Sequence, residues 1–169
     1  MKVLIVSDTH RKDQNLKLAL EREMPIDMLI HLGDSEGSEH LFQTWLPSST
    51  RFVAVKGNND FFSALDSERE LRIGRHKCLL THGHYYNVSL DTELLRQEAV
   101  ARGCDIAMFG HTHRPLIESR GGVTLLNPGS ISYPRQEGRQ CTYLLMEETA
   151  GEETQYTLKH LGAGELFSL

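Results

Sequence analysis

The chain has 169 residues, 39% of them hydrophobic, which is the length of one domain that can bury a substantial core. Its formal net charge of -5 and its lack of any lysine- or arginine-rich run argue against a general electrostatic attraction to nucleic acid. It contains no apolar stretch of 18 residues, so we expect no transmembrane helix.

The first ten residues combine a short apolar run with an aspartate directly after it, which does not resemble a secretory signal. We therefore expect a cytoplasmic protein without a membrane partner, folded as a single domain over residues 1–169. The cysteines are far apart and odd in number, which predicts neither a disulfide framework nor a Cys-x-x-Cys site. Each is expected to pack as a small hydrophobic residue.

The first part of the chain alternates predicted strands, polar loops and predicted helices. Continuous apolar runs rich in β-branched residues indicate strands buried on both faces, and apolar residues at helical spacing indicate the helices. The predicted strands are 2–7, 27–31 and 51–55, and the predicted helices are 14–23 and 38–46. This order favours parallel βαβ units, whose loops meet at the carboxyl edge of the sheet.

After residue 60 the pattern changes to hairpins around one clear helix. Hairpins are predicted over 69–80, 116–126 and 141–160, a helix over 91–102 and a strand over 106–109. An α/β half followed by hairpins suggests two sheets packed face to face with helices outside.

Several of the predicted strands end in a loop that carries metal-competent side chains. The seven candidate ligands are Asp8, His10, Asp34, Asn58, His82, His111 and His113. Because ligands bind at the carboxyl edge of an open α/β sheet, we expect these scattered residues to converge there. The set contains no thiolate, which argues against a structural zinc site. Carboxylate, imidazole and amide ligands suit Mn, Fe, Ni, Co or Zn, with Mg less natural beside so much imidazole.

The pair His111 and His113 follows the predicted strand 106–109. If the backbone is extended there, both imidazoles point to the same side, about 7 Å apart at the backbone. From that spacing each side chain can hold one of two ions, which lie ~3.5–4 Å apart in two-metal sites.

Seven candidate ligands are too many for one ion, so two ions that share a carboxylate fit better. Asp34 is the natural bridge, because it lies in the middle of the first three loops. Such a pair of ions makes a bridging hydroxide near neutral pH and stabilises the charge of a phosphoryl group under attack. The chemistry that needs this arrangement is phosphoester hydrolysis.

Each of these residues alone also has an ordinary structural explanation. Asp8 and Asp34 could be helix N-caps, and Asn58 and the segment 127–130 could form turns. The remaining lone histidines are expected to be surface or satisfied core residues: His31, His40, His76 and His160. Five ligand-bearing loops, each after a predicted strand, favour the metal site over independent caps and turns.

Six motifs follow one another along the chain: Asp8-x-His10, Gly33-Asp34, Gly57-Asn58, Thr81-His82-Gly83-His84, Gly110-His111-Thr112-His113 and Asn127-Pro128-Gly129-Ser130. In this order and spacing, residues 2 to about 135 resemble the calcineurin-like metallophosphoesterase superfamily, in its small bacterial and archaeal phosphodiesterase branch. The resemblance implies an α/β fold, a four-layer α/β/β/α sandwich of two mixed β-sheets flanked by helices. It also implies two ions, one held by Asp8, His10, Asp34 and His113 and the other by Asp34, Asn58, His82 and His111.

One position departs from the family pattern. Many members carry a histidine after the asparagine of the third motif, and that histidine is thought to assist the leaving group. Here the position is Asn59, which cannot act as a general acid but could donate a hydrogen bond to a phosphate oxygen. His84 is the other catalytic candidate, as a proton donor or a supporting residue. We expect activity to favour leaving groups that depart easily, such as aryl phosphates.

The sequence thus predicts a dinuclear metal-dependent phosphoesterase, in the first place a phosphodiesterase, in which a metal-bridging hydroxide attacks a small phosphoester substrate. Two divalent ions are the expected cofactors, with Mn ahead of Ni, Fe, Co, Zn and Mg. One alternative is a protein-interaction scaffold, as in a retromer coat subunit that resembles this branch, but every ligand position here is filled. A nuclease ranks lower, because the chain is acidic and has no visible basic groove.

The substrate itself is not predicted, and a homo-oligomer stays open. The walls of the substrate pocket are expected from the loops 60–66 and 85–88. In the second loop, Tyr85 and Tyr86 either stack on a base or simply pack. Arg135 either contacts a phosphate or lies free on the surface.

Overall fold

The computed structural model describes residues 1–162, which form two β-sheets and their covering helices. The helices are α1 (Gln14–Glu23), α2 (Glu39–Thr44), α3 (Glu93–Ala101) and the short 3-10 helix η1 (His84–Tyr86). The strands are β1 (Lys2–Val6), β2 (Met28–His31), β3 (Arg51–Ala54), β4 (Glu68–Ile73), β5 (His76–Thr81), β6 (Ile106–Met108), β7 (Pro115–Arg120), β8 (Val123–Pro128), β9 (Thr142–Glu147) and β10 (Gln155–His160).

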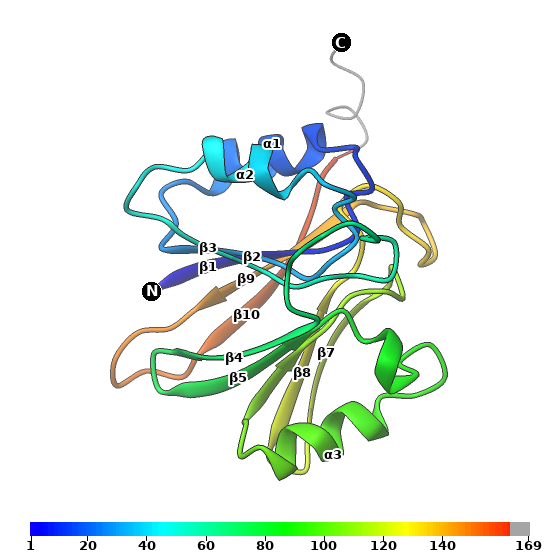
Figure 1. Cartoon of the computed structure of the whole chain (residues 1–169). Coiled ribbons are helices and arrows are strands. Elements are labelled where there is room, and N and C mark those ends of the chain that lie inside the picture. Colours follow the sequence, from blue (N-terminus) through cyan, green and yellow to red (C-terminus); the bar gives the residue numbers. More distant parts are fainter. Residues whose placement is uncertain (163–169) are drawn as a thin grey trace.

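The strands are arranged in two five-stranded sheets that face each other. The first sheet has the order β10-β9-β1-β2-β3 and the second the order β4-β5-β6-β8-β7. Helices α1 and α2 lie on the outer side of the first sheet and α3 on the outer side of the second (Figure 1). The predicted four-layer α/β/β/α sandwich is therefore confirmed.

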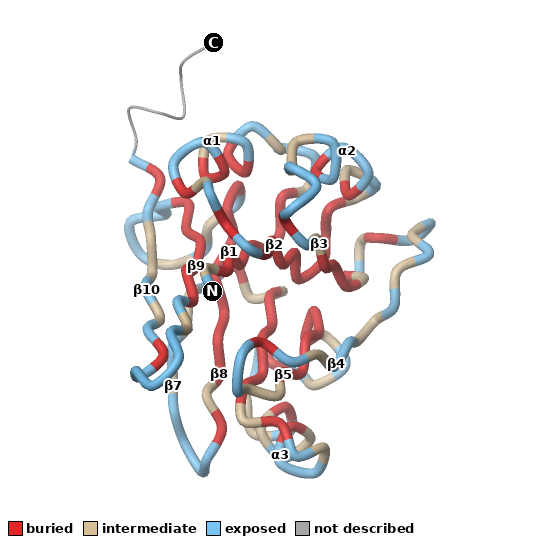
Figure 2. Tube along the Cα trace, turned by 90° about the vertical axis from the view of Figure 1, so that its left-hand side faces the viewer, coloured by how far each residue is buried: buried red, intermediate tan, exposed pale blue. Residues whose placement is uncertain are grey.

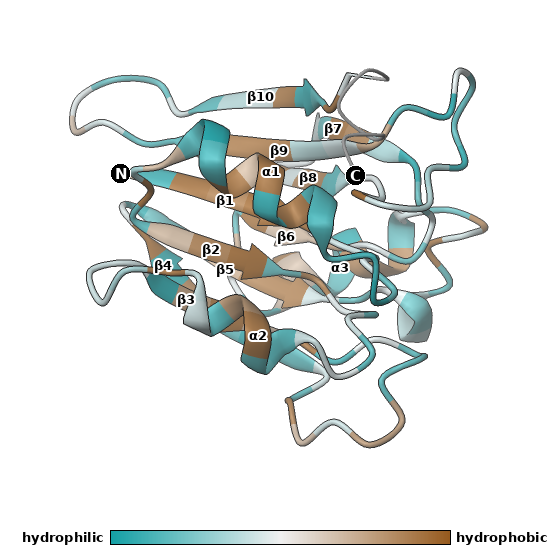
Figure 3. Cartoon of the chain, turned by 90° about the horizontal axis from the view of Figure 1, so that it is seen from above, coloured by the Kyte–Doolittle hydropathy of each residue, from teal (hydrophilic) through white to brown (hydrophobic). Residues whose placement is uncertain are grey.

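The first half of the chain forms the parallel βαβ units that its pattern predicts. β1 pairs with β2 and β2 with β3, both in parallel, with Leu4 opposite Leu29 and Leu29 opposite Phe52. Successive side chains of a strand point to opposite faces, so Val3 and Ile5 pack between the sheets while Leu4 packs under α1 and α2. A strand used on both faces must be apolar throughout, and Figure 3 shows this colouring along β1 and β2 beneath α1.

The second half contains the three predicted hairpins, β4–β5, β7–β8 and β9–β10, all antiparallel. The last hairpin joins the first sheet, because β9 pairs with β1 and places Leu144 opposite Ile5. The buried residues shown in Figure 2 run along the central strands of both sheets. Cys78, Cys104 and Cys141 are free and buried, as predicted.

Several elements differ from the prediction in type or by one or two residues in their bounds, among them β1, β2, β3 and α2. Residues 84–86 form the 3-10 helix η1 where a loop was expected, because Gly83 turns the chain with a φ of 102°. Helix α3 begins at Glu93 rather than at residue 91, because the Asp91 carboxylate accepts the backbone N–H of Glu93. Strand β6 ends at Met108, one residue early. Within residues 1–162, no helix is long and apolar enough to cross a membrane.

Candidate metal centre

The loops that follow β1, β2, β5 and β6 are held together by backbone hydrogen bonds at one edge of the two sheets. The N–H of Asp8 donates to the carbonyl of Gly33 at 3.1 Å, and the N–H of His10 donates to the carbonyl of Asp34 at 3.0 Å. The N–H of Gly110 donates to the carbonyl of His82 at 3.1 Å. The carboxyl edges of both sheets therefore present their side chains to one place.

Three of the predicted ligands form a first cluster at this edge. Nε2 of His113 lies 3.2 Å from Oδ1 of Asp8, and Nε2 of His10 lies 3.8 Å from the same oxygen. The two imidazole Nε2 atoms are 3.4 Å apart. These three ligand atoms lie close enough together to share one ion.

The other predicted ligands lie next to the first cluster. Nε2 of His82 is 3.4 Å from Oδ2 of Asp34 and 3.9 Å from Oδ1 of Asp8. Nδ1 of His111 is 2.9 Å from Oδ1 of Asn58, and the rings of His82 and His111 have their centroids 5.2 Å apart. The structure thus brings all seven candidate ligands together.

Asp34 lies between the two groups. Its Oδ2 is 3.4 Å from Nε2 of His82 and 3.8 Å from Nε2 of His10. Oδ1 of Asp8 is also close to histidines of both groups. Both carboxylates are therefore in reach of two ions, and the choice of Asp34 as the bridge stays a prediction.

Two of the histidine rings, those of His82 and His113, are fixed so that Nε2 faces the centre. Nδ1 of His82 lies 2.6 Å from the carbonyl oxygen of Leu32, and Nδ1 of His113 lies 2.6 Å from that of Tyr133. A carbonyl oxygen only accepts, so each Nδ1 must donate, and the neutral ring then has its lone pair on Nε2. A ring nitrogen fixed in this way is the usual support of a metal-binding histidine.

Several buried polar atoms at the centre have no hydrogen-bond partner among the described residues. They include Oδ1 of Asp8 and Nε2 of His82, both on fully buried side chains. A buried polar atom left without a partner costs about 1–3 kcal/mol, and more when charged. Divalent cations would satisfy these atoms, so the residues present fit the ions that the sequence predicts.

The ionisation of the buried groups also favours a cation. Burial alone would raise the pKa of Asp34, but the contacts with His82 and Asn59 hold it well below its usual value. The pKa of Asp8 is likewise lowered, because its contacts with His113 and His82 outweigh its burial. Burial would lower the pKa of His82, but Asp34 and Asp8 raise it to about 8. Two ionised carboxylates therefore face a group of imidazoles, and a metal must displace the proton from His82.

Five of the ligand residues have a left-handed backbone. The φ angles are 58° at Asp8, 44° at His10, 58° at Asp34, 65° at His111 and 58° at His113. The extended backbone considered for residues 111–113 is therefore wrong, and the two histidines converge through a turn. Residues other than glycine pay a conformational cost in this region, and such strain clusters at functional sites.

Close approach of the loops requires glycine at two positions. A Cβ at Gly57 would overlap the carboxylate of Asp34, and a Cβ at Gly110 would overlap Oγ of Ser7. Each glycine belongs to a motif that the sequence places next to a ligand. Their role here is to let two ligand loops touch.

Supporting residues were only partly visible in the sequence. Asp60 is buried and accepts the N–H groups of Asp34 and Gly57, both at 2.7 Å, and that of Glu36 at 2.6 Å. Asn127 donates to the carbonyl of Gly110 at 3.0 Å, so the segment 127–130 supports the ligand loop. Asp60 could have been suspected from its place directly after Asn58 and Asn59, but nothing in the pattern named its role.

The two residues predicted to be catalytic are both at the centre. Asn59 donates to Asp34 twice, from its backbone N–H at 2.8 Å and from Nδ2 at 2.7 Å. His84 has its ring centroid 5.5 Å from that of His82 and 6.1 Å from that of His111. Burial and the two neighbouring imidazoles lower the pKa of His84. Their catalytic roles stay predictions.

Three other aromatic residues considered in the sequence analysis lie outside the group of candidate ligands. His31 is buried, accepts the N–H of Gly33 on Nδ1 and contacts Oγ1 of Thr9 through Nε2, which confirms it as a satisfied core residue. Tyr86 packs and donates its hydroxyl to Glu68, whereas Tyr85 lies exposed.

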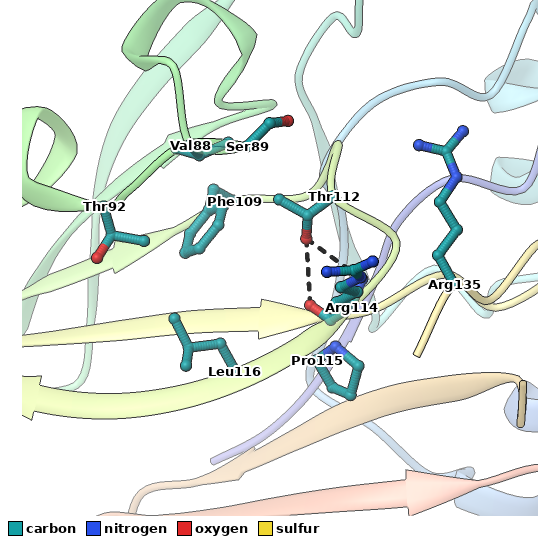
Figure 4. Close-up of a pocket in the computed structure, with 9 residues that line it drawn as sticks. All are labelled: Val88, Ser89, Thr92, Phe109, Thr112, Arg114, Pro115, Leu116 and Arg135. Carbon is teal, nitrogen blue, oxygen red and sulfur yellow. Dashed lines mark hydrogen bonds between the residues drawn. The ribbon is translucent and has the colours of Figure 1, made fainter. Parts of the chain in front are cut away.

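Three hollows surround the ligand loops. The one in Figure 4 has a volume of about 400 Å³ and is walled by apolar side chains with Arg114 and Arg135 at its edge. Of the loop 110–113 it contains only Thr112, so the metal ligands point elsewhere. Two other hollows open on the centre, one lined by His10 and His113 and one lined by Asn58 and His84. Each of these two hollows offers a substrate a way to the metal centre.

The sequence is similar to those of known proteins. A family model described as the calcineurin-like phosphoesterase superfamily domain matches residues 1–151. The chain is 37% identical to the probable metallophosphoesterase YsnB of Bacillus subtilis over 136 residues, 80% of this chain and 78% of that protein. It is 26% identical to the phosphodiesterase YfcE of Escherichia coli, covering 87% of this chain and 88% of that one.

Solved structures have the same architecture. A predicted phosphoesterase from Streptococcus pneumoniae superposes with a TM-score of 0.75 at 25% identity, covering 94% of this chain and 97% of that one. A Vps29 variant from Entamoeba histolytica also superposes with a TM-score of 0.75, at 24% identity over 96% of this chain and 100% of that one. The second likeness is one of fold alone.

Proposed function

The chain belongs to the calcineurin-like phosphoesterase superfamily, and from this premise we propose that it is a dinuclear metal-dependent phosphodiesterase. The family and the relatives named phosphodiesterases support a hydrolase that acts on phosphoesters. The proposal goes further in the number of ions, in the nucleophile and in the preference for diesters.

The observation that supports the proposal is the pair of adjacent groups of candidate ligands, with the carboxylates of Asp8 and Asp34 close to both. We assign one ion to Asp8, His10, Asp34 and His113, and the other to Asp34, Asn58, His82 and His111. The distances of 3.8 Å and 3.4 Å from Oδ2 of Asp34 to His10 and His82 support a bridge. Mixed carboxylate and imidazole ligands suit Mn first, with Ni, Fe, Co, Zn and Mg as alternatives.

Two divalent ions held by these residues would activate a water molecule as the nucleophile and would provide positive charge for the phosphoryl oxygens. The residues of the chain orient and tune this site. Asn59 holds the carboxylate of Asp34 with two hydrogen bonds, which fixes the proposed bridge. Asn59 cannot give a proton to the leaving group, so we expect aryl esters to react faster than alkyl esters unless His84 or a metal-bound water supplies that proton.

The proposal is tested by metal content and activity together. Protein stripped with a chelator and reloaded with Mn²⁺ should hold two ions per chain and hydrolyse a small aryl phosphodiester. Replacing Asp34 or His82 with Ala should abolish this activity, whereas replacing the exposed His40 with Ala should leave it unchanged. Wild-type turnover in both ligand variants, with metal present, would contradict the assignment.

A protein-interaction scaffold is the second candidate, and the likeness in fold to Vps29 is the observation behind it. The complete set of ligand residues in this chain favours the enzyme. A protein that binds no metal after reconstitution and hydrolyses no phosphoester would favour the scaffold.

A further inference from the structure

Two phenylalanine side chains on the loop after β3 are exposed to solvent. Phe61 is 74% exposed and Phe62 is 103% exposed. The loop is not loose around them, because Asp60 is buried and bonded to three backbone N–H groups, and Oγ of Ser63 donates to Glu39 at 3.2 Å. Removing an aromatic side chain from water lowers the free energy. An ordered loop that nevertheless exposes two such side chains suggests that they contact another molecule.

Both phenylalanines line a hollow beside Asn59 and Asp60, but only Phe61 also lines a second hollow next to Asn58. Phe61 lines a hollow of about 230 Å³ together with Tyr85, which comes from a different loop and is 68% exposed. Asn58 and His84 line the same hollow, so it contains one predicted ligand and one predicted catalytic residue. Phe62 does not line it.

The two aromatic rings at this hollow differ in their partners. Tyr85 rests on His84, with ring centroids 4.0 Å apart. Within residues 1–162, Phe61 makes no ring contact. Lys56 adds a positive charge to the lining, which suits an anionic ester. The hollow therefore offers two aromatic faces and a cation next to the place where a phosphate would be held.

We propose that Phe61 and Tyr85 form a stacking slot for a flat aromatic ring that the substrate carries as an ester group, a nucleobase or an aryl ring. This inference rests on the proposed phosphoesterase function and adds the class of substrate. Stacking on aromatic side chains tolerates different rings, because every base has a π-face, so the slot selects flatness rather than one particular base.

The slot is tested by comparing the affinities of phosphate esters that carry an aromatic ring with that of one that carries none. Isothermal titration of the Mn²⁺-loaded protein compares adenosine 5′-monophosphate with ribose 5-phosphate, which keeps the phosphate and the sugar. Base stacking should make the nucleotide bind tighter by roughly 5- to 100-fold. Phenyl phosphate is the third ligand: tight binding of it assigns the slot to any aryl ring, and weak binding assigns it to the larger nucleobase.

Single substitutions test the contribution of each of the two rings to binding. Phe61→Ala and Tyr85→Ala should each remove most of the preference for the nucleotide and leave the affinity for ribose 5-phosphate unchanged. Tyr85→Phe, which keeps the ring, should keep the preference. Phe62→Ala is the matched control, because it removes the same side chain from the neighbouring, more exposed position and should change neither affinity.

Equal or undetectable affinities of the wild-type protein for the two ligands would overturn the slot, and so would an equal loss in Phe62→Ala. A shift of the sedimentation coefficient in both Phe61→Ala and Phe62→Ala, with ligand affinities unchanged, would identify a protein-docking surface instead. Base-dependent binding without hydrolysis would retain the slot and reject the enzyme. Hydrolysis without base-dependent binding would do the reverse.

Discussion

Asn59 occupies the position at which the resemblance to the family leads us to expect a histidine, and its side chain donates a hydrogen bond to the carboxylate of Asp34. That contact gives the residue a measurable role that does not depend on proton transfer. Asn59→Ala should weaken metal binding about 10- to 100-fold, as is typical when a group that orients a ligand is lost. Competition with a fluorescent chelator measures this, and unchanged affinity in Asn59→Ala would show that Asp34 needs no such support.

His31 is a buried histidine outside the ligand set. Burial lowers its pKa from 6.5 to about 4, against the opposing charges of Asp60 and Asp8, so the folded protein holds the ring neutral. In the unfolded chain the ring takes up a proton below about 6.5. The stability that the neutral ring of His31 contributes is therefore fully present above that pH. It is lost as the pH falls from about 6.5 toward 4, and the loss is on the order of 3 kcal/mol.

This expectation is checked by urea unfolding of metal-free protein between pH 7 and pH 4. Other groups also titrate in this range, so the informative quantity is the difference between the wild type and His31→Gln. The variant should be less stable at pH 7 and should lose less stability on acidification. Parallel pH profiles of the two proteins would rule out His31 as a source of the acid sensitivity.

At the residue level, the sequence predicted which side chains form the candidate site better than it predicted their backbone conformation. All seven ligand types follow from polar residues placed after strands, and the structure brings them together. The left-handed backbone at His111 and His113 was not predictable, because it depends on contacts such as the hydrogen bond from Asn127 to Gly110. Long-range contacts of this kind leave no periodic pattern in the sequence.

At the level of elements, the loop after β3 carries a ligand, a hydrogen-bonding residue and two exposed aromatics within five positions. Asp60 holds this loop against the loop after β2, because it accepts the backbone N–H groups of Asp34 and Glu36 from that loop as well as that of Gly57 from its own. Asp60→Ala should lower the free energy of unfolding by about 3–5 kcal/mol, because three buried donors lose a charged acceptor.

Asp66, on the same loop but exposed, provides the control, and Asp66→Ala should change stability by less than about 0.5 kcal/mol. Urea unfolding of both variants measures the difference. Equal stabilities would mean that water replaces the Asp60 carboxylate without cost, and the loop would then be held by its other contacts.

The elements themselves differed in how far the sequence predicted them. Helix α1 has the predicted bounds, 14–23, because its apolar spacing, the proline after it and its packing all agree. The β9–β10 hairpin was predicted, but its pairing with β1 was not. Local pattern determines a hairpin, whereas the sheet that it joins depends on residues more than a hundred positions away.

At the level of the whole molecule, the candidate metal centre lies where the carboxyl edges of the two sheets meet. Asp8, His10, Asp34 and Asn58 follow strands of the first sheet, and His82, His111 and His113 follow strands of the second. Ions held between these groups would tie the sheets to each other. Saturating metal at 100 times its dissociation constant should therefore stabilise the fold by about 2.7 kcal/mol for each ion.

Thermal unfolding with and without chelator measures this effect. The wild type should melt at a higher temperature with Mn²⁺, and Asp34→Ala should show a much smaller shift. A melting temperature that does not respond to metal in the wild type would argue against ions that connect the sheets.

The left-handed ligand residues have a consequence for how this fold changes under selection. Five ligands occupy a backbone region that favours glycine and asparagine, so the chain keeps them against its own stability. A lineage freed from the need for hydrolysis would gain stability by losing these residues and keep the sandwich as a surface. A library of this chain selected only for resistance to heat, with a chelator present throughout, should accordingly accumulate substitutions at these five positions before it accumulates them in the core.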